Sequence, residues 1–134
     1  MNEDYKRRDE ILFGEYDPKR YDCGGYARCD NMPYSKFKQL YDEGFVDKYE
    51  AQNESPSTIE FIDIVNGHED WVEFETYAIS PDRSDYRITI EGINIWIPYD
   101  KTDELCYFVE QFRYADEFSL CTYEEGFHLR AWWD

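Results

Sequence analysis

The stretch WVEFETYAISPDRSDYRITIEGINIWI (residues 71–97) decides the fold of this 134-residue chain. Its first part, WVEFETYAI (71–79), alternates apolar and polar residues, which predicts a strand with one face toward water. After a turn-rich loop, YRITIE (86–91) and INIWI (93–97) repeat the same two-residue period. Gly92 separates them, so we expect a tight hairpin or a bulge there. The stretch therefore predicts three antiparallel strands.

A helix is predicted directly after these strands, at residues 102–114. Leu105, Phe108, Val109 and Phe112 recur there at i, i+3, i+4 and i+7, which is the spacing of one helical face. Beyond this helix, the sequence predicts two short strands at 117–122 and 126–133.

The segment before residue 70 is expected to be helical over 34–66. Residues 34–43 place apolar side chains at helical intervals, and Gly44 suits the position just past a helix end. Ser57 and Glu60 have the spacing of a capping box, which predicts the start of a second helix.

The whole chain, residues 1–134, is predicted to be a single domain of the α+β class. Residues 70–134 contribute an antiparallel β-sheet, a meander plus C-terminal strands, together with the helix at 102–114. The helices are expected to pack on one face of the sheet. Residues 1–33 carry several turn signals and are expected to form an irregular N-terminal arm, in which 5–13 can make a short helix.

Charge limits the partners that this chain can have. The sequence contains 31 acidic and 14 basic residues, for a net charge of −17. Residues 1–48 hold 11 acids and 9 bases, whereas residues 49–134 hold 20 acids and 5 bases, so the net charges are −2 and −15. Such a field argues against direct binding to nucleic acid or an anionic membrane, because phosphate contacts need clustered Lys and Arg. It attracts basic protein surfaces instead.

The sequence predicts a cytoplasmic protein. The first residues, MNEDYKRRDEILF, lack the apolar stretch of a signal peptide. No apolar run approaches the roughly 20 residues of a membrane span. In a reducing compartment the four cysteines are expected to be free thiols.

The cysteines do not form a recognisable metal-binding motif. Cys23 and Cys29 have five residues between them, whereas structural zinc sites usually have two to four. Cys106 falls on the predicted helix and Cys121 on a predicted strand, and we interpret both as small core residues. We expect no metal and no cofactor.

Catalytic motifs are also missing. His68 and His128 are accompanied by neither a GxSxG motif nor a cysteine-protease signature. Adjacent carboxylates are so frequent that no one pair is distinguished as a catalytic acid and base. We therefore expect a protein without catalytic residues.

The most informative feature is the set of acidic and aromatic residues at positions predicted to face outward. Carboxylates at fixed spacing can imitate the phosphates of a nucleic acid, and tyrosines among them can anchor a partner protein. The candidate partner-binding residues are Glu73, Glu75, Tyr77, Glu91, Asp103, Tyr107, Glu110, Tyr114, Asp116 and Glu117.

Over residues 49–134 the chain resembles acidic phage-encoded inhibitors of host defence, including anti-CRISPR proteins that mimic DNA. The shared features are a small α+β chain, a meander such as 71–97, a following helix at 102–114, and interleaved acids and tyrosines. The segment SPDRSDYRITIEGI (80–93) is similar in style to small mobile-element or gene-cassette proteins. The first resemblance implies blockade of a nuclease or another nucleic-acid-binding protein.

The leading hypothesis is a non-enzymatic inhibitor, monomeric or homodimeric, that occupies the basic nucleic-acid-binding surface of a partner. One alternative is a gene-cassette domain that binds a small ligand in an aromatic pocket. Another is a dimerisation module that pairs through an exposed strand or through its Trp132–Trp133 end.

Overall fold

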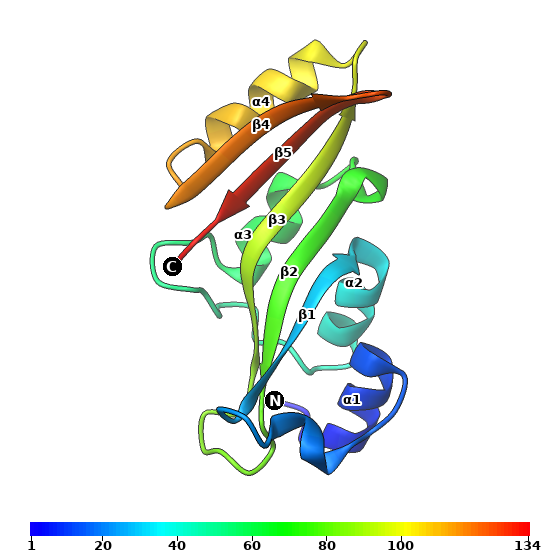
Figure 1. The fold of residues 1–134 in the computed structure, drawn as a ribbon, viewed down its shortest axis with the longest axis vertical. Coiled ribbons are helices and arrows are strands. Elements are labelled where there is room, and N and C mark those ends of the chain that lie inside the picture. The colour runs from blue at the N-terminus through cyan, green and yellow to red at the C-terminus, as the bar shows by residue number, and fades with distance from the viewer.

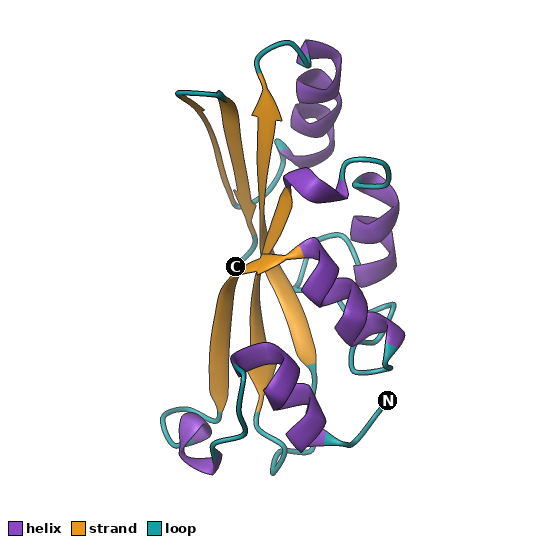
Figure 2. Ribbon diagram, turned by 90° about the vertical axis from the view of Figure 1, so that its right-hand side faces the viewer, coloured by secondary structure: helices purple, strands orange, loops and turns teal.

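Five antiparallel strands form one sheet in this computed structural model, which describes residues 1–134. The α-helices lie on one side of that sheet, whereas a short 3-10 helix at Pro18–Tyr21 lies at its lower end (Figure 2). The expected α+β fold, with an antiparallel sheet and helices on one face, is therefore confirmed. The order of the strands across the sheet is β1-β2-β3-β5-β4. The strands are β1 (Tyr26–Pro33), β2 (Val72–Ile79), β3 (Ile88–Pro98), β4 (Glu117–Tyr123) and β5 (Gly126–Trp132), and the helices are α1 (Tyr5–Phe13), α2 (Tyr34–Asp42), α3 (Thr58–Ile64) and α4 (Thr102–Phe112).

The hydrophobic core lies between the helices and the inner face of the sheet. Phe74 of β2 is fully buried there, with ring centroids 4.9 Å from Phe37 of α2 and 5.6 Å from Phe61 of α3. Ser57 accepts a hydrogen bond from the Glu60 amide, and the Glu60 side chain accepts one from the Ser57 amide. The predicted capping box therefore starts α3.

Strand β3 is one continuous strand rather than two. Its five isoleucines all face the core, but the register shifts where Glu75 pairs with Gly92 and Thr76 pairs with Ile90. Glu91 is the extra residue, so Gly92 marks the predicted bulge and the hairpin alternative is wrong. A side chain at Gly92 would place its Cβ 3.2 Å from the Ala131 carbonyl oxygen, which explains the glycine.

Residues 1–33 contain regular helix and strand, so the expected irregular arm needs correction. The short helix appears at Tyr5–Phe13 as α1, but the edge strand β1 was not predicted. The apolar alternation of β1 is broken because its register shifts between Cys29 and Met32, and Asn31 has a φ of 54°. In Figure 1 α1 lies beside this edge of the sheet, at the lower end of the molecule.

A buried ion pair fixes the N-terminal segment to the rest of the fold. Arg8 and Asp9 are both 0 % exposed, and Arg8 Nε donates to Asp9 Oδ1 at 3.0 Å. The Tyr21 hydroxyl donates to Asp9 at 2.7 Å, and the Arg8 guanidinium lies 4.4 Å from the centre of the Tyr86 ring.

None of the helices has the length and apolar character that a membrane crossing requires.

Candidate functional site: an acid–aromatic groove

Most of the acidic side chains in residues 49–134 have no ion-pair partner inside the chain. Of the 20 carboxylates there, six are paired with arginine, which leaves 14 unpaired. The six paired ones are Glu50, Glu75, Asp85, Glu91, Glu110 and Glu117. The negative charge of this segment is therefore available to a partner.

Three chain segments meet at one end of the sheet because of the strand register. Val72, at the start of β2, pairs with Ile95 near the end of β3. Pro98, at the end of β3, pairs with Gly126, which follows the two-residue turn between β4 and β5. The start of β2, the end of β3 and the β4–β5 turn are thus neighbours.

A groove of about 500 Å³ lies where these segments meet. We call it the acid–aromatic groove, because carboxylates and aromatic rings dominate its lining and no lysine or arginine lines it. It is lined by Asp70, Trp71, Glu73, Trp96, Pro98, Tyr123 and Glu125. Asp70, Glu73 and Glu125 belong to the unpaired carboxylates.

Both indole rings of the groove are held in place by neighbouring rings. Trp71 lies with its ring centroid 4.7 Å from His68 and 6.5 Å from Phe108 of α4. Trp96 stacks on His128 of β5, with ring centroids 4.6 Å apart and planes only 10° apart. Aromatic side chains fixed in this way lose little conformational freedom when they bind a partner.

A hydrogen-bonded network on the outer face of the sheet fixes His128 in turn. Arg130 makes two hydrogen bonds to Glu75, at 2.7 and 2.8 Å, and Asn94 Nδ2 donates to Glu75 at 2.8 Å. Asn94 Oδ1 is then left to accept, so it receives the proton of His128 Nε2 across 2.8 Å. We call Arg130, Glu75, Asn94 and His128 the outer-face network, and its effect is to orient Trp96.

The charges of this network follow from its geometry. Burial acts to raise the pKa of Glu75, but the hydrogen bonds from Arg130 and Asn94 and the charge of Arg130 outweigh it and lower that pKa. Burial and the nearby Arg130 charge lower the pKa of His128. The carboxylate is therefore ionised and the imidazole neutral at neutral pH, which suits a ring stacked on an indole.

The strand residues of the predicted partner-binding set divide between the groove and this internal network. Glu73 lines the acid–aromatic groove. Glu75 and Glu91 point to the outer face as expected, but they are only 8 % and 6 % exposed and pair with Arg130 and Arg28. The Tyr77 hydroxyl donates to Gln52 at 2.7 Å and accepts from an arginine. Glu75, Glu91 and Tyr77 thus bind other side chains of this protein. They stabilise the fold instead of facing a partner.

The helix residues of that set lie elsewhere. Asp103 and Tyr107 of α4 line a second, smaller groove of about 310 Å³, together with Asp63 and Glu104. The Tyr107 hydroxyl donates to the Ile64 carbonyl at 3.1 Å, which ties α4 to α3.

The last members of the set are exposed and lie outside both grooves. Tyr114 is 75 % exposed, and Glu110 faces solvent 3.7 Å from Arg113. At the start of β4, Asp116 accepts from the Asp134 amide at 2.8 Å, and Glu117 lies 3.7 Å from Arg130.

Six residues of the acid–aromatic groove were missing from the sequence-based set, which contains only Glu73 of the lining. The missing residues are Asp70, Trp71, Trp96, Pro98, Tyr123 and Glu125. Glu124–Glu125 could have been recognised as a turn between two predicted strands. Its proximity to Trp96 depends on the pairing of β3 with β5, which alternation along one strand does not reveal.

Two of the four cysteines do not lie where they were expected. Cys106 and Cys121 are exposed, not buried in the core, because each occupies the outward side of its element. Cys121 pairs in register with His128, yet no hydrogen bond joins them, since the His128 ring stacks on Trp96. No three potential metal ligands converge anywhere in the chain.

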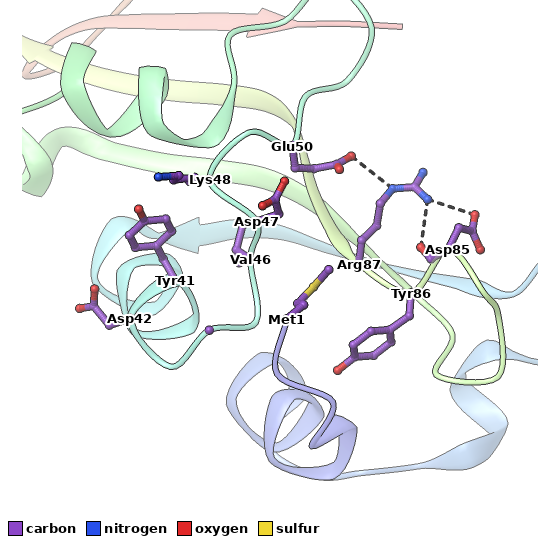
Figure 3. A pocket seen from close by; sticks show the side chains of 11 residues that line it. Met1, Tyr41, Asp42, Val46, Asp47, Lys48, Glu50, Asp85, Tyr86 and Arg87 are labelled. Atoms are coloured by element: carbon purple, nitrogen blue, oxygen red, sulfur yellow. Dashed lines mark hydrogen bonds and ion pairs between the residues drawn. The ribbon is translucent and has the colours of Figure 1, made fainter.

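The largest cavity lies elsewhere and differs in its chemistry. It is an open groove of about 810 Å³ between the N-terminus and the residues around Arg87 (Figure 3). Arg87 there is 3.3 Å from Glu50 and 3.0 Å from Asp85, so its charge is satisfied within the chain. Only two aromatic side chains, Tyr41 and Tyr86, line it, and it does not resemble the aromatic pocket of the small-ligand alternative.

Comparison of this chain with protein-family models, with curated proteins and with solved structures finds no match.

Proposed function

We propose that this protein is a non-enzymatic inhibitor that occupies the basic, nucleic-acid-binding surface of a partner protein. The observation that carries the proposal is the acid–aromatic groove, in which three unpaired carboxylates surround two indole rings and no basic residue is present. A lysine or arginine side chain is the group that this lining complements. Its charge is attracted to the carboxylates, and its cation can lie over a tryptophan face.

The basic residue of the partner is proposed to be one that normally contacts phosphate. Nucleic-acid-binding proteins place clustered Lys and Arg side chains in accessible grooves. The net charge of −15 over residues 49–134 draws such a surface toward this chain from a distance. The two rigid indoles then supply the short-range contacts that slow dissociation. A cytoplasmic location, shared with such a partner, is part of this proposal.

The proposal is tested by competition with DNA. Fluorescently labelled duplex DNA is bound to each member of a panel of purified nucleases and transcriptional repressors, and this protein is added at 50 mM and at 200 mM salt. We expect displacement of DNA from at least one panel member, with weaker displacement at the higher salt concentration. If the protein displaces DNA from none of the panel members, the proposal is wrong.

Two matched triple variants separate the groove from the overall charge. The groove variant is Asp70→Asn with Glu73→Gln and Glu125→Gln. The control variant is Glu3→Gln with Glu10→Gln and Glu15→Gln, three exposed acids without ion pairs near the N-terminus. Each variant removes three negative charges, so the net charge changes from −17 to −14 in both. The groove variant should lose displacement and the control should retain it, whereas equal losses would show that only net charge matters.

A further inference from the structure

The two edges of the sheet are built differently. The β1 edge is interrupted by a register shift and by Asn31 at positive φ, and it ends at Pro33. Its Cys29 thiol also donates to the Leu12 carbonyl, at the end of α1, at 3.7 Å. Bulges, prolines and covering elements are the usual means by which proteins prevent an edge strand from pairing with another chain.

The β4 edge carries none of these features. Its register with β5 is continuous from Glu117 to Tyr123. The five residues between those two, FSLCT, contain no charge, proline or glycine. Leu120 at the centre is 42 % exposed, although it pairs with the fully buried Leu129. In a chain with a net charge of −17, an uncharged exposed edge is an exception that calls for an explanation.

The open backbone groups of this edge can be assigned from the turn. Tyr123 pairs with Gly126 across a two-residue turn, and such a closing pair is hydrogen-bonded on both sides. Backbone groups alternate in direction along an antiparallel strand. The N–H and C=O groups of Phe118, Leu120 and Thr122 therefore point away from β5, toward the place of a sixth strand.

Charge decides what can occupy that place. Acidic pairs flank the strand at both ends, Asp116–Glu117 before it and Glu124–Glu125 after it. If a second copy of this chain paired antiparallel about Leu120, the acids of each copy would lie opposite the acids of the other. Like charges in opposed positions are destabilising, which disfavours self-pairing.

We propose that β4 binds an extended segment of the partner as an added sixth strand, and that this segment has an uncharged centre with Lys or Arg at both ends. This inference rests on the proposed function, because it takes the partner to be basic, and it names the element through which the partner docks. Main-chain hydrogen bonds to Phe118, Leu120 and Thr122 provide the affinity. The acidic pairs at the two ends select the basic flanks.

The test uses the full chain and three synthetic peptides. The first has five alternating valines and threonines with two lysines at each end. The second has the same sequence with N-methyl groups on all five central residues, so that neither edge of the peptide can donate hydrogen bonds, and the third has glutamates in place of the lysines. Fluorescence anisotropy should show binding of the lysine-flanked peptide alone. Equal binding of the methylated or the glutamate-flanked peptide would overturn the proposal, as would no binding of the first.

Two variants at one position provide the matched control. Leu120→Pro removes an N–H that points away from β5, so it leaves the β4–β5 hydrogen bonds intact. Leu120→Thr keeps that N–H. We expect proline to weaken peptide binding about tenfold, through the lost hydrogen bond and the blocked approach of the added strand. Threonine should leave the affinity nearly unchanged, and equal affinities of the two variants would contradict docking at the β4 edge.

Hydrogen exchange and the DNA competition complete the test. The amides of Phe118, Leu120 and Thr122 should become protected when the lysine-flanked peptide is added, and unchanged exchange at all three would contradict the proposal. If Leu120→Pro loses the peptide but still displaces DNA from the panel proteins, the edge is not the docking element and the proposed function still stands. Light scattering tests for self-pairing. If it detects dimers that dissociate in the Leu120→Pro variant, a second copy of the chain occupies the edge, and the proposal of a basic partner segment is wrong.

Discussion

At the residue scale, buried polar groups in this protein serve to orient other groups. The outer-face network, which runs from Arg130 through Glu75 and Asn94 to His128, ends on the Trp96 ring. Glu75 was expected to face a partner, but it acts on Trp96 through Asn94 and His128 instead. Its substitution should therefore affect binding by loosening Trp96, without removing a direct contact.

The titration of His128 provides a prediction for this network. Its pKa in the folded protein is lowered below 6.5 by burial and by Arg130. Between that lowered pKa and pH 6.5, the unfolded chain therefore binds more protons than the folded protein does. The free energy of unfolding should fall as the pH falls through this interval. NMR titration of the imidazole and urea unfolding at several pH values measure both effects. His128→Gln should remove this part of the pH dependence, and a His128 pKa above 6.5 would contradict the assignment.

The buried Arg8–Asp9 pair gives a second prediction at this scale. Asp9→Asn leaves the Arg8 charge buried without its partner, and Arg8 is 0 % exposed. We expect a loss of about 3 kcal/mol in the free energy of unfolding, measured by urea denaturation. Replacing both residues, with Arg8→Met and Asp9→Leu, should recover most of that loss. A double variant as unstable as Asp9→Asn would show that packing, not the unpaired charge, is responsible.

At the element scale, the turn between β4 and β5 determines both the groove and the open edge. A side chain at Gly126 would overlap the backbone of Ile97 and Pro98, so β3 and β5 could not keep their present spacing. We expect Gly126→Ala to cost about 2 kcal/mol in the free energy of unfolding, because backbone cannot move aside as a flexible side chain can.

Gly67→Ala serves as the comparison for that variant. Gly67 has a φ of +88° and open space around it, so alanine there should cost only the backbone strain, about 1 kcal/mol. Thermal unfolding of the two variants side by side measures the difference. A Gly126→Ala protein as stable as Gly67→Ala would contradict the close approach of β3 and β5.

Strands and helices with a regular apolar period were predictable from the sequence. The apolar spacing of 102–114 predicted the helix found at Thr102–Phe112, and 126–133 contains β5 at Gly126–Trp132. Strand β1 was missed because its alternation breaks at the irregular step between Cys29 and Met32. Strand β3 was divided in two because Glu91 and Gly92 interrupt the isoleucine period.

The candidate site was less predictable than the elements, for a physical reason. Outward direction follows from alternation, so Glu73 and Glu75 were correctly assigned to one face of β2. Exposure depends on the neighbouring strand, where Arg130 of β5 reaches Glu75 across β3. Side-chain pairs of this kind depend on the order of the strands, and a single sequence without pairing information does not reveal that order.

At the scale of the whole molecule, charge and structure divide the chain in the same way. Residues 1–48 have a net charge of only −2, and they form α1, β1 and α2 toward one end of the sheet (Figure 1). The acid–aromatic groove and the β4 edge both lie in the segment with a net charge of −15. The account assigns a supporting role to the first segment and partner binding to the second.

The measurement that tests this account most directly is the affinity of Trp96→Ala for a protein identified in the DNA competition, measured by calorimetry. If a basic side chain of that protein lies against the Trp96 ring, alanine should weaken binding by at least about tenfold, the loss typical of a buried aromatic anchor. Tyr49→Ala, which removes a 70 % exposed aromatic ring outside the groove, should leave the affinity unchanged. Equal affinities of the two variants would contradict the central claim that the acid–aromatic groove is the binding site.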